Sequence, residues 1–110
     1  MEIRTRVNNT VQVIELQGRL DAHQAKQMDK TLTDVLSATN HTVVNLRNAH
    51  FIDSTGLSVL IKGMKHYREQ QGDLVLCELQ QPVRIIFELT RLERMFQIYP
   101  TEDEAIQAFQ

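Results

Sequence analysis

The chain has 110 residues, a formal net charge of −2 at pH 7 and a hydrophobic fraction of 42%. This length fits one domain, residues 1–110, and this fraction is enough for a hydrophobic core without disulfides. Lysine and arginine are scattered rather than clustered, whereas nucleic-acid binding needs a basic face, so we expect no nucleic-acid partner. No apolar run approaches the roughly 20 residues of a membrane span, and the first residues do not begin a signal peptide, so we expect no membrane segment.

The single cysteine, Cys77, lies in the apolar run Leu74-Val75-Leu76-Cys77. One cysteine cannot form an internal disulfide, which fits a reducing compartment and predicts a cytoplasmic location. The apolar run predicts that Cys77 is a small buried hydrophobic residue rather than a catalytic or redox group.

The first third of the chain predicts a hairpin and a helix. Residues 3–7 alternate apolar and polar, as in an edge strand, and a short turn at Asn8-Asn9 leads to a second strand over 11–16, so we expect an antiparallel pair. Asp21 is predicted to cap a helix over 22–37, with Gln24 as its capping-box partner. The apolar face of that helix comprises Ala25, Met28, Leu32, Val35 and Leu36.

Strands and helices alternate in the rest of the chain. Residues 42–46 are apolar on both faces, which predicts an interior strand, and a loop over 48–52 leads to a helix reaching about Gln71, with Gly72 as its C-cap. The later elements are a strand over 73–79, a helix opening at Pro82, a strand over 96–99 and a helix capped by Thr101 and Glu104. The order β-β-α-β-α-β-α-β-α predicts an α/β fold with one mixed sheet.

The helix start at Asp53-Ser54-Thr55-Gly56 holds more hydroxyls than an N-cap needs. The sequence argues against a serine hydrolase here because the first glycine of Gly-x-Ser-x-Gly is missing. His66, the one histidine beyond this point, follows on the same helix and cannot fold back onto its start. The four histidines, His23, His41, His50 and His66, are not spaced as paired metal ligands. His41 and His50 flank the predicted strand over 42–46 and are interpreted as polar loop residues.

The histidine spacing predicts no metal site, and the lack of a glycine-rich phosphate loop predicts no nucleotide cofactor. With no catalytic base either, we predict no enzymatic activity. A phosphate added at a helix start is tolerated by the helix dipole, yet its charge disrupts an apolar or acidic docking surface. Ser54 or Thr55 therefore suits a binding switch. The residues alone leave this hypothesis open beside a plain N-cap.

Three segments together resemble the STAS domains of bacterial anti-sigma factor antagonists (anti-anti-sigma factors). They are Gly18-Arg19-Leu20-Asp21, Val43-Val44-Asn45-Leu46 and Phe51-Ile52-Asp53-Ser54-Thr55-Gly56-Leu57. The likeness extends to residues 82–90 and 101–105, and thus over essentially the whole chain. It implies the STAS fold.

The resemblance also implies a partner-switching phosphoprotein. In such a system the unphosphorylated protein binds a serine kinase that is also an anti-sigma factor, of the histidine-kinase-like ATPase fold, and a PP2C-type phosphatase restores binding after phosphorylation. Ser54 is then the phosphoacceptor, with Thr55 as the minor alternative. The implied partner-binding residues are Asp21, Asp53, Ser54, Thr55, Gly56 and Leu57, of which Gly56 permits close approach and Leu57 supplies apolar contact.

One departure concerns the late helix, where Thr90-Arg91-Leu92 stands in place of the Ser-Gly-Leu that the family often carries. The arginine adds charge to a surface that faces the partner in such systems. An alternative is a STAS scaffold or regulatory module of a transporter or other non-sigma target, which docks without phosphorylation.

Overall fold

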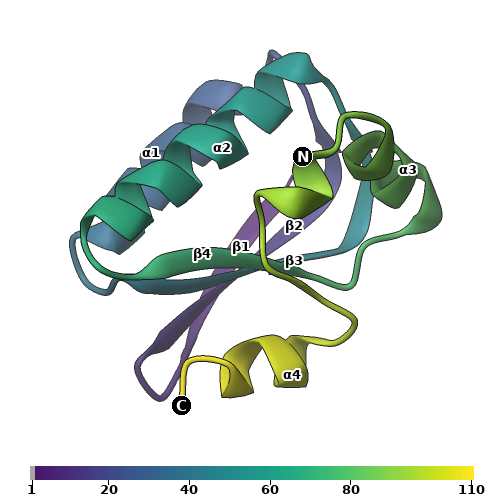
Figure 1. The fold of residues 1–110 in the computed structure, drawn as a ribbon. Helices are drawn as coiled ribbons and strands as arrows, with labels where there is room; N and C mark the ends of the chain where they lie inside the picture. The colour runs from purple at the N-terminus through teal and green to yellow at the C-terminus, as the bar shows by residue number, and fades with distance from the viewer. Residues whose placement is uncertain (1) are drawn as a thin grey trace.

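The computed structural model describes residues 2–110, and it confirms the predicted order of strands and helices with one added 3-10 helix (Figure 1). The elements are β1 (Glu2–Asn8), β2 (Val11–Leu20), α1 (Ala25–Leu36), β3 (His41–Ile52), α2 (Ser54–Glu69), β4 (Asp73–Cys77), α3 (Gln81–Leu89), η1 (Leu92–Arg94), β5 (Ile98–Tyr99) and α4 (Glu102–Gln107).

The five strands form one mixed sheet whose spatial order, β1-β2-β3-β4-β5, is the order of the chain. β1 pairs antiparallel with β2, as the hairpin predicted, and every later pairing is parallel. β3 lies in the middle of the sheet, which confirms the interior strand. Parallel neighbours require helical crossovers, and α1, α2 and α3 supply them.

Helices cover the two faces of the sheet unequally (Figure 1). α1, α2 and α3 pack on one face, and their larger core includes Met28, Leu60 and Phe87. α4 packs on the opposite face, where Ala105 and Ile106 contact a smaller core. That smaller core is built by alternate strand residues and comprises Val11, Val13, Val43, Val75 and Cys77.

β3 is much longer than predicted, because residues 48–52, expected as a loop, continue the strand. Leu46, Ala49 and Ile52 all face the larger core although they are three residues apart. The register of β3 against β2 shifts twice, between Glu15 and Gln17 and between Gly18 and Arg19. Each bulge adds one extra residue to β3, so that the next apolar side chain again points into the core. The apolar residues of β3 therefore do not alternate with a period of two. His41 and His50 are consequently strand residues rather than loop residues.

The predicted cap of α1 is wrong. The helix begins at Ala25, three residues later than expected, and its N-cap, Gln24, makes no side-chain capping hydrogen bond. Asp21 instead accepts a hydrogen bond from the backbone N–H of His23, at 3.0 Å, within a turn. The N–H of Ala22 donates to the Asp53 carboxylate, at 3.1 Å, and so ties this turn to the start of α2, a tertiary contact that sequence spacing does not reveal.

The C-terminal end of α2 also differs from its prediction. The helix ends at Glu69, and the left-handed residue beyond it is Gln71, with φ of 64°, rather than Gly72. Gly72 is required for space, since a Cβ placed there would lie 1.9 Å from the backbone oxygen of Asn40. β4 ends at Cys77, before its predicted end, because Glu78 is also left-handed, with φ of 58°.

Cys77 is fully buried in the smaller core, which confirms its prediction as a buried hydrophobic residue. Burial raises the pKa of the thiol to about 12, and the nearby carboxylates of Glu102 and Glu78 add to the shift. The thiolate needed for nucleophilic or redox chemistry is therefore scarce at neutral pH. In the part of the chain that the structure describes, no helix has the length and apolar character needed to cross a membrane.

Candidate functional site

Ser54 and Thr55 lie on the surface at the first two positions of α2. The cap of this helix is the carboxylate of Asp53, whose Oδ1 accepts a hydrogen bond from the backbone N–H of Gly56 at 2.9 Å. The capping role that we assigned to one hydroxyl thus belongs to the acid. Neither hydroxyl is needed to hold the helix start, and both are accessible for modification or contact.

Gly56 and Leu57 fix α2 against the sheet. A Cβ on Gly56 would lie 2.5 Å from the backbone oxygen of Leu20 and 3.1 Å from Cγ2 of Ile52, so only glycine lets the helix approach this closely. Leu57 packs in the larger core with 8% of its surface exposed. Its side chain therefore anchors the helix start and offers almost no apolar surface, unlike the partner contact that we expected from it.

The structure brings residues 18–21 and 51–57 together, as the family resemblance implied. The last two residues of β2 and β3 pair, with Leu20 opposite Ile52. Asp53 then continues the ladder, because its backbone N–H donates to Leu20 at 3.2 Å and its Oδ2 accepts from Ala22. Asp21 lies in this turn, next to the helix start that carries Ser54.

Arg19 supports the same end of the sheet, and sequence reasoning gave it no role. Its guanidinium lies 4.2 Å from the centre of the Phe51 ring, a cation–π geometry. Its Nε is 3.7 Å from a carboxylate oxygen of Asp21, so a loose ion pair orients the acid. Arg19 and Phe51 lie in two of the segments that carry the family resemblance, residues 18–21 and 51–57. Their contact could not be predicted because it depends on the pairing of these two segments in the fold.

The α2 start offers helix-dipole stabilisation to an added anion, beside the carboxylates of Asp53 and Asp21. The first turn of the helix contains no acidic residue beyond the capping Asp53, and the basic residues of its last turn, His66 and Arg68, lie at the opposite end. Unpaired N–H groups at a helix start carry partial positive charge and stabilise phosphate there. No group of three or more His, Cys, Asp or Glu side chains within residues 2–110 is arranged to hold a metal ion.

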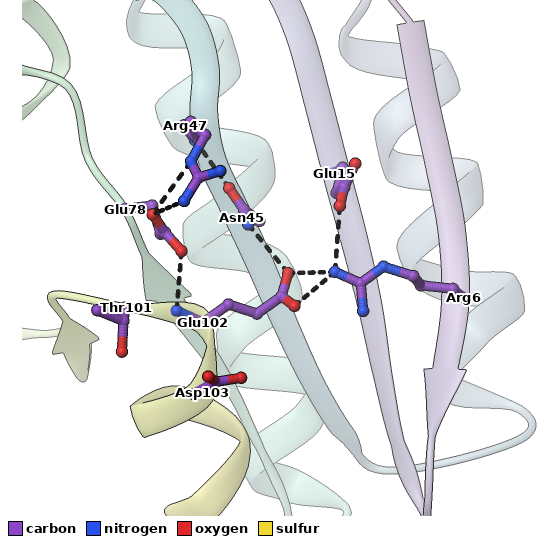
Figure 2. A pocket seen from close by; sticks show the side chains of 8 residues that line it. All are labelled: Arg6, Glu15, Asn45, Arg47, Glu78, Thr101, Glu102 and Asp103. Carbon is purple, nitrogen blue, oxygen red and sulfur yellow. Dashed lines mark hydrogen bonds and ion pairs between the residues drawn. The ribbon is translucent and has the colours of Figure 1, made fainter.

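A second polar region lies on the other face of the sheet, beside the start of α4 (Figure 2). It is an open pocket of about 370 Å³, and Figure 2 shows polar side chains from β1, β2 and β3, from Glu78 just after β4, and from the start of α4 converging on it. Its lining comprises Arg6, Glu15, Asn45, Arg47, Glu78, Thr101, Glu102 and Asp103. Sequence reasoning missed this cluster, although one polar residue, Asn45, interrupts an otherwise apolar strand.

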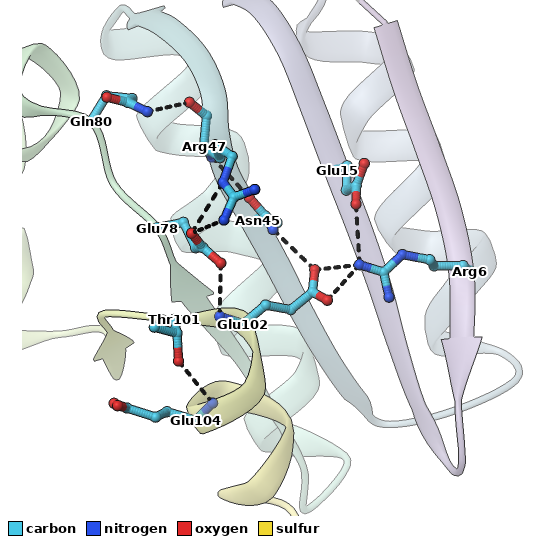
Figure 3. A network of polar contacts seen from close by, with 9 residues as sticks. All are labelled: Arg6, Glu15, Asn45, Arg47, Glu78, Gln80, Thr101, Glu102 and Glu104. Atoms are coloured by element: carbon cyan, nitrogen blue, oxygen red, sulfur yellow. Dashed lines mark hydrogen bonds and ion pairs between the residues drawn. The ribbon is translucent and has the colours of Figure 1, made fainter.

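The polar side chains of this region form one network that fastens α4 to the sheet (Figure 3). The Glu102 carboxylate receives hydrogen bonds from Arg6 and from Asn45, and the Glu102 backbone N–H donates to Glu78 at 3.0 Å. Glu78 also accepts from Arg47 at 2.8 Å. The predicted Thr101 cap is confirmed, since its hydroxyl accepts from the Glu104 N–H at 3.2 Å. Because the acids and arginines bind each other, the pocket is a structural contact between α4 and the sheet.

Burial is the largest single influence on the pKa of Glu102 and raises it, but the hydrogen bonds from Arg6 and Asn45 and the charges of Arg6 and Arg47 together outweigh burial and lower that pKa. A carboxylate whose pKa falls on folding stabilises the protein above its unfolded-state pKa, and this stabilisation disappears as pH falls. Glu102→Gln is therefore expected to reduce the free energy of unfolding by about 1–2 kcal/mol at about pH 7, and by much less at about pH 3.

Urea unfolding of both proteins at the two pH values measures this difference. Glu104→Gln is the matched control, because Glu104 is exposed in the same helical turn and its side chain makes no contact in the network. A Glu102→Gln effect that stays constant between the two pH values would contradict the role of the ionised carboxylate.

Arg91 occupies a left-handed position between α3 and η1, with φ of 61° and ψ of 19°. This is the position where the family often carries glycine, and glycine reaches such angles without steric cost. We expect Arg91→Gly to raise the free energy of unfolding by about 0.5–1 kcal/mol, since relief of left-handed strain exceeds the added freedom of the unfolded chain. Thermal unfolding with Arg94→Gly as control checks this, because Arg94 lies within η1 and glycine there should destabilise.

Comparison with known proteins places the chain in a family. The STAS domain family model matches residues 2–105, so the chain belongs to the STAS domain family. The Anti-sigma F factor antagonist of Paenibacillus polymyxa is 25% identical over 96% of this chain and 92% of its own. BtrV of Bordetella bronchiseptica, whose name also refers to anti-sigma factor antagonism, is 34% identical over 86% of this chain and 82% of its own.

Solved structures agree with this fold. An anti-sigma factor antagonist from Mycobacterium paratuberculosis superposes with a TM-score of 0.88 at 23% identity, covering 97% of this chain and 92% of that protein. The Bacillus protein SpoIIAA, solved in an unphosphorylated and in a phosphorylated form, gives a TM-score of 0.76 for each. The identities are 22% and 23%, and coverage is at least 97% of each chain. At these identities the structures support the predicted STAS fold, with its mixed five-stranded sheet.

Proposed function

We propose that this protein is an anti-sigma factor antagonist that acts as a partner-switching phosphoprotein. In its unphosphorylated form it binds a serine kinase that also serves as the anti-sigma factor, and that kinase transfers phosphate to Ser54. Phosphorylation ends the binding, and a PP2C-type phosphatase restores it. The protein acts by binding and release, without an active site of its own.

The observation that carries this proposal is the exposed Ser54 at the start of a 16-residue helix whose cap is supplied by Asp53. Because capping does not use the serine hydroxyl, phosphate can be added without loss of the cap. The helix start stabilises the added charge, of about −1.5 to −2, so the domain stays folded while its surface changes. The names of the relatives and the two forms of SpoIIAA support the same function.

The test is phosphorylation by a serine kinase of the anti-sigma factor class, chosen from the genes that neighbour this one, with ATP, followed by mapping of the phosphate by mass spectrometry. We expect one phosphate on Ser54, and none on the Ser54→Ala variant. Ser58→Ala is the matched control, because Ser58 is exposed one turn further along α2 and its Oγ donates to the backbone oxygen of Ser54. It should accept phosphate like the wild type.

Phosphate on Thr55 would move the switch by one residue and leave its mechanism intact. Phosphate elsewhere, or none, would contradict the proposal. Stable binding of the kinase without any phosphorylation would favour a docking module that works without modification.

A further inference from the structure

Asp53 connects two segments that are 31 residues apart. Its Oδ1 accepts from the Gly56 N–H, at 2.9 Å, and caps α2. Its Oδ2 accepts from the Ala22 N–H, at 3.1 Å, and reaches the turn that follows β2. A single carboxylate thus fixes the start of α2 and the 21–24 turn at the same time.

The 21–24 turn depends on this connection for its position. Within the turn, the Gln24 N–H donates to the backbone oxygen of Asp21 at 3.0 Å, and the Asp21 side chain accepts from His23. These bonds define the shape of the turn but not its place. Among the residues that the structure describes, the Ala22–Asp53 hydrogen bond is the one that joins residues 21–24 to the start of α2.

A direct contact between Asp53 and a partner is the competing explanation for an acid beside Ser54. Both carboxylate oxygens already accept backbone hydrogen bonds, and the residue is only partly exposed. A cation of a partner would have to compete with those bonds. Ala22, His23, Ser54 and Thr55, by contrast, are all exposed and are held side by side through Asp53.

We propose that Asp53 is a positioning residue that makes the 21–24 turn and the start of α2 one recognition surface for the kinase. The kinase then recognises folded substrate, with Ser54 as acceptor and the turn as a second contact. This inference rests on the proposed phosphorylation of Ser54 and adds to it the source of substrate recognition.

Two variants break the connection from opposite sides. Asp53→Asn keeps one carbonyl oxygen to cap α2, as asparagine does well, but its amide group cannot accept from Ala22. Ala22→Pro removes the N–H donor and leaves Asp53 charged. Ala22 is the second residue of a four-residue turn, where proline is favoured, so this change suits the local backbone. Ala22→Gln keeps the donor and serves as the control.

The experiment measures steady-state phosphorylation of each variant by the neighbouring kinase, thermal unfolding, and amide hydrogen exchange of His23 and Gln24. For Asp53→Asn and Ala22→Pro we expect a KM raised roughly five- to ten-fold, the effect of losing one ordinary intramolecular hydrogen bond. The value of kcat should stay within about two-fold, because the acceptor hydroxyl is unchanged. Exchange at His23 and Gln24 should quicken in both variants, and Ala22→Gln should match the wild type.

An increase in KM for Asp53→Asn but not for Ala22→Pro would overturn the inference in favour of direct partner contact by the acid. An unchanged KM in both variants, with the wild type phosphorylated on Ser54, would overturn the inference alone. A wild type that accepts no phosphate would overturn the proposed function and, with it, the kinase-recognition role of the turn.

Discussion

Gly72→Ala is expected to lower the free energy of unfolding by about 3 kcal/mol or more, beyond the usual cost of one excess methyl group in a packed site. The added Cβ would lie 1.9 Å from the backbone oxygen of Asn40. That oxygen accepts the Asp73 N–H at 3.0 Å, and the Asn40 amide donates to Gln70 at 2.9 Å, so the neighbour cannot move without breaking the end of α2 and the start of β4. Urea unfolding measures the loss.

Gln71→Gly is the matched variant, because position 71 carries the left-handed φ of 64°. Glycine accepts this angle without steric cost, and we expect stabilisation of about 0.5–1 kcal/mol. If the left-handed angle at position 71 carried no cost for glutamine, Gln71→Gly would bring no gain. Destabilisation by both substitutions would contradict the division of roles between the two residues.

Ser54→Asp is expected to weaken binding of the kinase by about 30-fold or more, equivalent to about 2 kcal/mol, while Ser54→Ala binds as the unphosphorylated wild type does. The aspartate places a second negative charge beside Asp53 on the proposed docking surface, where it must be desolvated on binding. Isothermal titration of the neighbouring kinase with each variant measures the difference.

Ser58→Asp is the control for this experiment, since it adds the same charge on the exposed surface one turn further along α2. Thermal unfolding should show that Ser54→Asp is folded, as a helix start tolerates an acid. Equal affinities of Ser54→Ala and Ser54→Asp would argue against charge as the basis of the switch. Equal weakening by Ser58→Asp would mean that the effect reports general repulsion rather than a defined site.

The sequence predicted the order of elements and the helix start at Ser54 because those features follow from local patterns. The apolar spacing of α2 and the hairpin signal at Asn8-Asn9 need no tertiary information. β3 was cut short for a definite reason: its core residues Leu46, Ala49 and Ile52 are three apart, and only the two bulges against β2 make that spacing compatible with a strand.

Other features could not be predicted because they depend on contacts between distant segments. Asp21 has the chemistry of an N-cap, yet its side chain closes a turn that the Ala22–Asp53 hydrogen bond ties to α2, and α1 begins only at Ala25. The resemblance implied a partner contact for Leu57, but the close approach at Gly56 packs its side chain into the core. Similarly, the Glu102 network joins residues from both ends of the chain, and no local sequence pattern predicts it.

The contact between Arg6 and Glu102 spans 96 residues and has a consequence for biosynthesis. Each new strand of this sheet can add to an edge formed by the strand before it, so the sheet assembles in step with translation. The valines at 11, 13, 43 and 75 have no helix over them until residues 102–107 leave the ribosome. Apolar sheet surface exposed during this interval promotes aggregation. Substitutions that weaken the contacts between α4 and the sheet should therefore lower the yield of folded protein in cells while the start of α2 keeps its structure.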